Sequence, residues 1–168
     1  MPVNPKKSLG QNFLSDNNII KKIINVSKIS SNDIVLEIGP GTGNLTKFII
    51  SQKPKKIIVI EKDQNLANYL KQKFSNKIEI IANDIFKMPN DFYSGKKFLI
   101  LGNLPYNIST KILTNLCLND HLSVSKMILM FQKEVAERII ANTHSKEYGR
   151  ITILSKWKFD IKKVTDVK

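Results

Sequence analysis

The sequence has few residues that could form a disulfide or hold a metal ion. Its 168 residues include one cysteine and two histidines. Cys117 lies in an apolar stretch and is predicted to belong to the core, whereas His121 and His144 stand in polar stretches and are predicted to be exposed. No set of Cys and His has the spacing of metal ligands. We therefore expect neither an internal disulfide nor a metal site.

Long apolar runs are absent as well. No run approaches the roughly 20 residues that a membrane-spanning helix needs. The first residues also lack the apolar centre of a secretory signal peptide. The sequence therefore predicts a cytoplasmic protein with no membrane partner.

Acidic residues are scarce relative to basic ones, and arginine is scarce among the basic ones. The chain carries 27 basic and 14 acidic residues, a net charge of +13, and only Arg138 and Arg150 are arginine. This imbalance favours a polyanionic partner over a small metabolite. Because lysine contacts phosphate as a point charge, we expect recognition of a nucleic-acid backbone and its shape more than of base edges. A codon bias toward lysine also explains a high lysine count, but explains the charge imbalance less easily.

The apolar patterns predict helices that alternate with strands. A helix capped by Ser15 or Asp16 runs through residue 27, a second follows residue 43, and a third carries Leu66, Tyr69, Leu70 and Phe74. The predicted strands span residues 33–38, 56–60, 77–81, 97–101 and 127–131. Such alternation is typical of a parallel sheet covered by helices on both faces. No internal repeat interrupts it, so we expect one α/β domain over residues 1–168 that begins with a basic segment, residues 1–15.

A glycine-rich turn after the first predicted strand is a candidate ligand-binding segment. Gly39, Gly41 and Gly43 form a Gly-x-Gly-x-Gly pattern, which differs from the Gly-x-Gly-x-x-Gly fingerprint of dinucleotide-binding proteins. No Lys-Ser/Thr pair follows, as a phosphate-binding P-loop requires. Glu37 directly precedes the turn, where it would repel a pyrophosphate but suits a ligand with an amino group and a sulfonium.

The next two predicted strands also end in acidic residues. Glu61 is placed to accept hydrogen bonds from both hydroxyls of a ribose, and Asp84 is suited to the amino group of an adenine. Taken singly, each is also compatible with an ordinary strand end that carries a polar cap. In this order along the chain, the turn and the two acids favour S-adenosyl-L-methionine as the cofactor over NAD or ATP.

The tetrapeptide Asn103-Leu104-Pro105-Tyr106 follows a fourth apolar strand and suits the methylation of a nucleobase amine. The lone pair of such an amine is delocalised into the ring, so the nitrogen is a poor nucleophile. The Asn103 side-chain oxygen and a nearby backbone carbonyl can accept hydrogen bonds from its two N–H groups, which returns the lone pair to the nitrogen. Pro105 restricts the backbone so that the carbonyls are aimed, and Tyr106 offers a face for stacking. An Asn-x-Pro sequence also forms ordinary turns, so the tetrapeptide alone leaves both interpretations open.

Several stretches together resemble the ribosomal RNA adenine N6,N6-dimethyltransferases. They are residues 7–14 (KSLGQNFL), 37–43 (EIGPGTG), 102–109 (GNLPYNIS), 131–138 (FQKEVAER) and 148–150 (YGR). The resemblance implies a Rossmann-like class I methyltransferase fold with S-adenosyl-L-methionine as the methyl donor. It implies as substrate two adjacent adenines in a hairpin loop near the 3′ end of small-subunit ribosomal RNA. The implied partner is the immature small ribosomal subunit.

The resemblance also implies roles for individual residues. Cofactor contacts are implied for Asn12, Leu14, Gly39, Glu61, Asp84 and Asn103, and contacts with the target base for the four residues from Asn103 to Tyr106. The basic segment with Lys6 and Lys7 is then placed to fold over the cofactor and meet phosphate. The alternative for that segment is a frayed basic terminus.

The chain departs from the family pattern at its end. In the family, a following segment supplies a second aromatic for the adenine, a last antiparallel strand and a C-terminal helical domain that binds RNA. We therefore expect a mostly parallel, doubly wound sheet without that strand and domain, in a truncated protein whose own activity is in question. Losing one stacking partner, worth about 1–3 kcal/mol, would weaken target capture by roughly ten- to a hundredfold.

Two other functions remain open from the sequence. One is a large-subunit ribosomal RNA adenine methyltransferase that confers antibiotic resistance, which would share the cofactor site. The other is an RNA-binding ribosome assembly factor without catalysis. The presence of Glu61, Asp84, Asn103 and Tyr106 together argues against the second, because RNA binding alone requires none of them.

Overall fold

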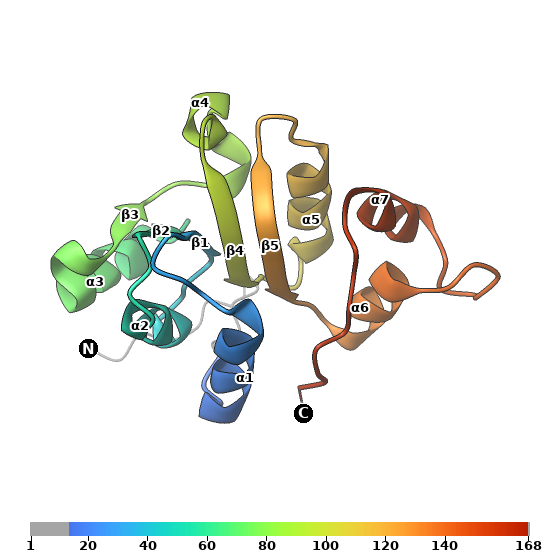
Figure 1. The fold of residues 1–168 in the computed structure, drawn as a ribbon, viewed down its shortest axis with the longest axis horizontal. Helices are drawn as coiled ribbons and strands as arrows, with labels where there is room; N and C mark the ends of the chain where they lie inside the picture. Colours follow the sequence, from blue (N-terminus) through green and yellow to red (C-terminus); the bar gives the residue numbers. More distant parts are fainter. Residues whose placement is uncertain (1–13, 168) are drawn as a thin grey trace.

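Five parallel strands form one sheet in the order β3-β2-β1-β4-β5. The computed structural model describes residues 14–167, so the predicted roles of Lys6, Lys7 and Asn12 lie outside the described residues. The strands, drawn as arrows in Figure 1, are β1 (Ile34–Ile38), β2 (Lys56–Ile60), β3 (Glu79–Ile81), β4 (Lys97–Asn103) and β5 (Ser123–Met130). The predicted parallel α/β architecture is confirmed, and no antiparallel strand occurs between residues 14 and 167.

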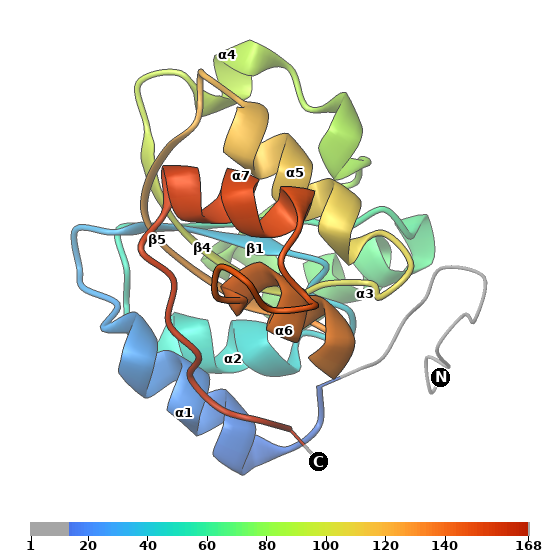
Figure 2. The ribbon, with the colours of Figure 1, turned by 90° about the vertical axis from the view of Figure 1, so that its right-hand side faces the viewer.

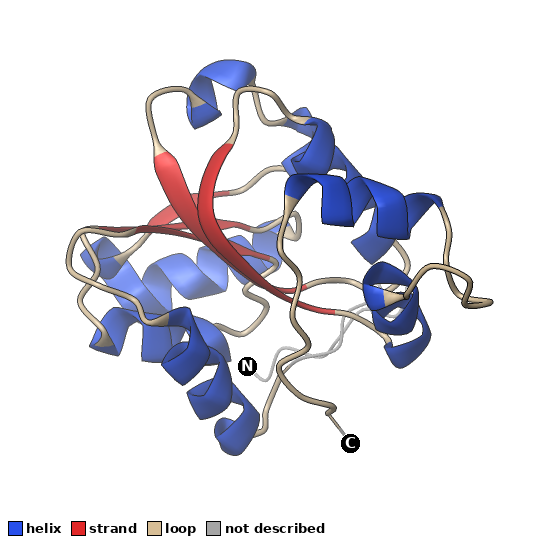
Figure 3. Cartoon of the chain, turned by 45° about the vertical axis from the view of Figure 1, so that its right-hand side comes forward, coloured by secondary structure: helices blue, strands red, loops and turns tan. Residues whose placement is uncertain are grey.

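Helices cover both faces of this sheet (Figure 3). They are α1 (Asn17–Ser27), α2 (Asn44–Ser51), α3 (Gln64–Phe74), α4 (Asn90–Tyr93), α5 (Ser109–Leu118), α6 (Lys133–Ile140) and α7 (Arg150–Lys158). Two short 3-10 helices, η2 (Ser75–Lys77) and η3 (Ile85–Lys87), flank β3. Parallel strands need such crossover connections, because consecutive strands begin at the same edge of the sheet.

The alternation of side chains along the strands divides the core into two layers. In β1, β2 and β4, odd-numbered residues such as Val35, Val59 and Leu101 pack with α1, α2 and α3. Even-numbered ones such as Leu36 and Ile100 pack with α4, α5 and η3. Because successive strand side chains point to opposite faces, nearly continuous apolar strands are what a sheet covered on both faces requires.

A third apolar cluster lies outside α5, where α6 and α7 pack. It contains Leu113, Cys117, Ile139 and Ile151, all buried. The prediction that Cys117 belongs to the core is therefore confirmed. After α7 the chain runs without regular secondary structure along the side of the molecule that carries β5, and its described part, up to residue 167, approaches α1 (Figure 2).

Helix α1 is held at both ends by side chains. The Asp16 carboxylate accepts hydrogen bonds from the backbone N–H groups of Asn18 and Ile19, so Asp16 is the N-cap, one of the two residues predicted. At the other end, the Lys126 ammonium on β5 donates to the carbonyls of Val26 and Ser27. The edge strand therefore caps a helix from the beginning of the chain.

Three strand boundaries differ from the prediction by two residues or more. Strand β5 begins at Ser123, four residues before the predicted start. Its first residues are polar and largely exposed at the edge of the sheet, so the apolar pattern did not include them. Strand β3 begins only at Glu79, because the 3-10 helix η2 and the positive φ of Ser75 precede it. Strand β4 continues two residues further, to Asn103.

Neither a membrane span nor a metal centre emerges from the part of the chain between residues 14 and 167. No helix there is long and apolar enough to cross a membrane, and no three His, Cys, Asp or Glu side chains converge as metal ligands. His121 and His144 are exposed, as predicted.

Candidate active site

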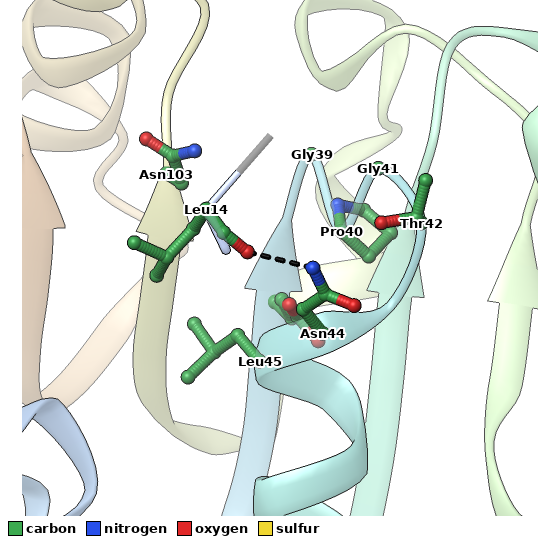
Figure 4. Close-up of a pocket in the computed structure, with 9 residues that line it drawn as sticks. Leu14, Gly39, Pro40, Gly41, Thr42, Asn44, Leu45 and Asn103 are labelled. Atoms are coloured by element: carbon green, nitrogen blue, oxygen red, sulfur yellow. Dashed lines mark hydrogen bonds between the residues drawn. The ribbon is translucent and has the colours of Figure 1, made fainter. Parts of the chain in front are cut away.

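A pocket lies at the carboxyl ends of β1 and β4, where ligands collect in open α/β sheets. Four of the predicted site residues line it together: Leu14, Gly39, Gly41 and Asn103. The other lining residues are Glu37, Pro40, Thr42, Asn44 and Leu45. In Figure 4, Leu14 and Asn103 lie on one side of the pocket and the glycine-rich turn on the other, with the Leu14 carbonyl directed toward Asn44. The prediction that Asn103 stands at the tip of a strand is confirmed, because it is the last residue of β4.

The glycine-rich turn requires glycine at its bends. Gly39, Gly41 and Gly43 have φ values of +67°, +57° and +78°, in the left-handed region that other residues avoid. The Gly39 N–H donates to the carbonyl of Ile60 at the end of β2, over 3.0 Å. A Cβ on Gly39 would stand 3.7 Å from the carbonyl oxygen of Asn103. The turn therefore lies directly beside the tip of β4.

Gly43 contributes to packing and does not line the pocket. It is the N-cap of α2, and a Cβ there would come within 2.4 Å of the Phe74 ring and 2.8 Å of the Leu70 side chain. Both residues belong to α3, so Gly43 lets α3 close against the turn. The predicted contact of Gly43 with a cofactor stays a prediction.

Glu37 is the most deeply buried acid at the site. Its side chain is 1% exposed, and its Oε2 accepts a hydrogen bond of 2.7 Å from the Thr46 hydroxyl on α2. Burial raises the pKa of Glu37 to about 8, with a further contribution from the nearby Glu61 charge, while the Thr46 hydrogen bond acts in the opposite direction. Without a positive charge beside it, Glu37 is thus protonated at neutral pH, and a bound cation would favour its ionised form.

Glu61, just after β2, connects the turn to the next strand. Its carboxylate accepts from the N–H of Gly41 over 3.3 Å and from the N–H of Asp63 over 2.9 Å. Burial is the main cause that raises the pKa of Glu61, and it outweighs these hydrogen bonds. Each carboxylate oxygen can accept more than one hydrogen bond, so this position is compatible with the predicted contact to ribose hydroxyls.

Asp84 stands after β3 and outside the residues that line the pocket. It caps η3 through the N–H of Phe86 and forms an ion pair of 2.9 Å with Lys62. Burial acts to raise the pKa of Asp84, but the hydrogen bonds from Lys62 and Phe86 and the charges of Lys62 and Lys87 together hold it below the usual value. Asp84 is therefore a carboxylate at the tip of the third strand, as the predicted adenine contact requires.

The tetrapeptide after β4 turns directly into α5. Leu104 is 1% exposed, with its side chain in the core, while Pro105 and Tyr106 are half-buried. The Pro105 carbonyl accepts from the N–H of Ile108, and the Tyr106 carbonyl accepts from the Ser109 hydroxyl. These bonds fix the course of the backbone, and Tyr106 is only partly buried.

The sequence did not predict the part that Asn44 takes in the pocket. Its side-chain amide donates to the Leu14 carbonyl over 2.8 Å, between positions 30 residues apart (Figure 4). Nothing in the spacing indicates such a contact, since an Asn at the start of a helix usually caps its own backbone. Thr46 was also missed as the partner of Glu37.

The sheet order and the pocket at its carboxyl edge are those of the Rossmann-like methyltransferase fold. Two solved structures support this class. A dimethyladenosine transferase from Plasmodium falciparum aligns with a TM-score of 0.74 at 36% identity, over 86% of this chain and 52% of that one. The 23S rRNA methyltransferase ErmE aligns with a TM-score of 0.68 at 28% identity, over 86% of this chain and 55% of that one.

The particular family follows from the sequence match. The family described as "Ribosomal RNA adenine dimethylase" matches residues 3–168, and the chain belongs to this family. A relative from Pelagibacter ubique (strain HTCC1062), named ribosomal RNA small subunit methyltransferase A, is 50% identical over 170 residues. The match covers all of this chain and 64% of that relative, so the chain spans just under two thirds of its length.

Proposed function

We propose that this chain is the catalytic domain of an S-adenosyl-L-methionine-dependent enzyme that dimethylates N6 of two adjacent adenines in small-subunit ribosomal RNA. The domain spans residues 1–168, and the substrate is a 3′-terminal hairpin loop in the immature small ribosomal subunit. The enzyme thus acts in ribosome biogenesis in the cytoplasm. The observation that carries the proposal is that Asn103, at the tip of β4, lines the same pocket as the glycine-rich turn.

The residues present fit S-adenosyl-L-methionine. Glu37 provides a buried acid beside the pocket for the positively charged end of the ligand, and Leu14 provides an apolar wall. Glu61 and Asp84, at the tips of the next two strands, suit the ribose and the adenine. When bound, the cofactor would supply an activated methyl group and become a neutral thioether, and the proton that N6 loses on methylation would pass to water. No strong general base is therefore required from the protein.

Asn103 and the residues after it act on the target adenine. The Asn103 side-chain oxygen and the Leu104 carbonyl accept hydrogen bonds from the two N6 N–H groups and orient the nitrogen lone pair toward the methyl donor. The ring of Tyr106 stacks on the base after it leaves its loop, which costs at most a few kcal/mol in single-stranded RNA. Alignment of this kind contributes on the order of 7–11 kcal/mol to catalysis.

Calorimetric titration of the 168-residue chain with S-adenosyl-L-methionine tests the cofactor site. We expect saturable binding that Glu61→Ala weakens by about ten- to a hundredfold, because a hydrogen bond to a charged group contributes about 1.5–3 kcal/mol. Glu79→Ala is the matched control, since Glu79 is an exposed acid on β3. Absence of heat from wild-type chain that is folded by circular dichroism would contradict the proposal.

Methylation of small ribosomal subunits that lack the modification tests the reaction. Asn103→Ala should lower turnover by about a hundredfold or more, as the loss of a transition-state hydrogen bond does in other enzymes. Turnover that survives this substitution would refute the proposed role of Asn103.

A second candidate function is methylation of an adenine in large-subunit ribosomal RNA. The similarity to the 23S rRNA methyltransferase ErmE favours it. Offering both ribosomal subunits with labelled methyl donor separates the two functions, because the label enters only the RNA that is the substrate. Tight RNA binding without cofactor binding would instead favour an assembly factor without catalysis.

A further inference from the structure

Asn44 connects two walls of the pocket. It is the first residue of α2 and directly follows the glycine-rich turn. Its side-chain Nδ2 donates to the main-chain oxygen of Leu14, and both residues line the pocket (Figure 4). Leu14 belongs to the segment that leads into α1 and has no regular secondary structure. One hydrogen bond thus joins the turn to a segment 30 residues earlier in the chain.

The bond is directed away from the helix that carries Asn44. Gly43, the N-cap of α2, has no side chain to cap it, and an Asn near this position would ordinarily bond to the backbone of its own helix. Here the amide crosses to another segment instead. A half-buried amide held at 2.8 Å from a carbonyl fixes the position of that carbonyl relative to the turn.

Leu14 has a second attachment through its side chain. The side chain packs against the core cluster formed by α1, α2 and the odd-numbered strand residues. The apolar contact holds the side chain without defining the direction of the main chain, because apolar contacts are not directional. The hydrogen bond from Asn44 supplies that direction.

We infer that Asn44 is a positioning residue, which holds the Leu14 segment in place as one wall of the cofactor pocket. The turn and the segment then form one unit, so a ligand that contacts both meets a preorganised site. The inference rests on the proposed function for the identity of the ligand, S-adenosyl-L-methionine. Preorganisation of this kind raises affinity by removing the cost of ordering a segment on binding.

Two variants and one control test this role. Asn44→Ala removes the amide, while Asn44→Asp keeps its size but cannot donate. Asn17→Ala is the control, since Asn17 is also the first residue of a helix, α1, and is exposed. Hydrogen exchange by mass spectrometry, without ligand, follows a peptide that covers residues 14–19. Calorimetry measures the affinity of Asn44→Ala and Asn17→Ala for S-adenosyl-L-methionine.

We expect faster exchange in that peptide for both Asn44 variants and wild-type exchange for Asn17→Ala. We also expect about three- to tenfold weaker cofactor binding for Asn44→Ala, in the range of one neutral hydrogen bond, with unchanged circular dichroism. Unchanged exchange in both Asn44 variants would overturn the inference. Weaker binding without faster exchange would also overturn it, because Asn44 would then act on the ligand directly. If wild-type chain binds no cofactor, the proposed function fails, whereas the exchange data still test the bond.

Discussion

The two halves of the site are built differently. The turn half consists of Gly39–Gly43 with Glu37 and Glu61, and its hydrogen bonds reach other elements: Gly39 to β2, Glu37 to α2, and Glu61 back to the turn. The base half consists of residues 103–106, and its Pro105 and Tyr106 carbonyls accept from the N–H of Ile108 and the hydroxyl of Ser109, where α5 begins. The turn half is thus held by hydrogen bonds to other elements, whereas these two carbonyls after β4 are held by bonds to residues three positions later.

The difference corresponds to what each half would bind. A small cofactor gains affinity from a site that is already formed, because little has to be ordered when it binds. A base that must leave an RNA loop needs a surface that remains accessible, and Tyr106 is only partly buried. The comparison therefore predicts large stability effects in the turn half and binding effects in the base half.

The largest effect is expected at Gly43. Gly43→Ala should destabilise the fold by on the order of 3 kcal/mol or more, because the added Cβ would lie 2.4 Å from the Phe74 ring at a φ of +78°. Urea unfolding followed by circular dichroism measures the loss. Gly95→Ala is the matched control, since Gly95 has a φ of +70° and nothing within 4 Å of the added Cβ. Gly95→Ala should lower the free energy of unfolding by only about 1 kcal/mol. An equal loss at both positions would show that the contact with Phe74 is unimportant.

A smaller effect that depends on pH is expected at Glu37. Its pKa is raised from 4.5 to about 8 in the folded chain, so between these values the unfolded chain loses a proton that the folded chain keeps. Wild-type stability should therefore fall as the pH rises from about 4.5 to about 8. Glu37→Gln removes this loss, and it should gain on the order of 3 kcal/mol over wild type near pH 8 and little near pH 4.5.

Thermal unfolding at a series of pH values measures this gain. Glu79→Gln is the control, because it removes the same charge from the surface of β3, and it should give a small difference at every pH. If Glu37→Gln differs from wild type by a constant amount across the range, Glu37 is already ionised in the folded chain and our account of its burial is wrong.

The smallest change in stability, with a clear change in binding, is expected at Tyr106. Tyr106→Ala should weaken binding of an adenine-containing hairpin RNA by about 1–3 kcal/mol, the value of one stacking contact, and leave cofactor affinity unchanged. Tyr106→Phe keeps the ring and should bind like wild type. Fluorescence anisotropy with a labelled RNA measures both. If the Phe variant binds as weakly as the Ala variant, the hydroxyl group and not the stacking surface is responsible.

The sequence predicted the centre of the fold better than its edges. Strands β1 and β2 lie within one residue of prediction, because their apolar residues are buried on both faces of the sheet. The start of β5 was missed because Ser123, Ser125 and Lys126 are exposed at an edge, where polar residues interrupt the apolar run. The pattern of apolar residues indicates which residues of a strand are buried, and an edge strand has fewer buried residues than a central one.

The candidate site shows a similar division. Gly39, Gly41 and Asn103 were found because each residue type suits a chemical task at a strand end, and the structure brings them to one pocket. The packing role of Gly43 depends on Phe74, and the bond of Asn44 depends on Leu14. Both partners are distant in the sequence, so neither contact leaves a local pattern that could have been recognised.

The bond from Lys126 to the end of α1 has a consequence for synthesis of the chain. The Lys126 ammonium and the Val26 carbonyl are 100 residues apart in the sequence. Strand β1 likewise pairs with β4, which lies much later in the chain. Contacts of such long range slow folding, because a large loop must close before they form. On a translating ribosome, the first helix and the central strand would therefore leave the exit tunnel long before their partners exist. We expect this domain to stay incompletely folded until β5 has been made.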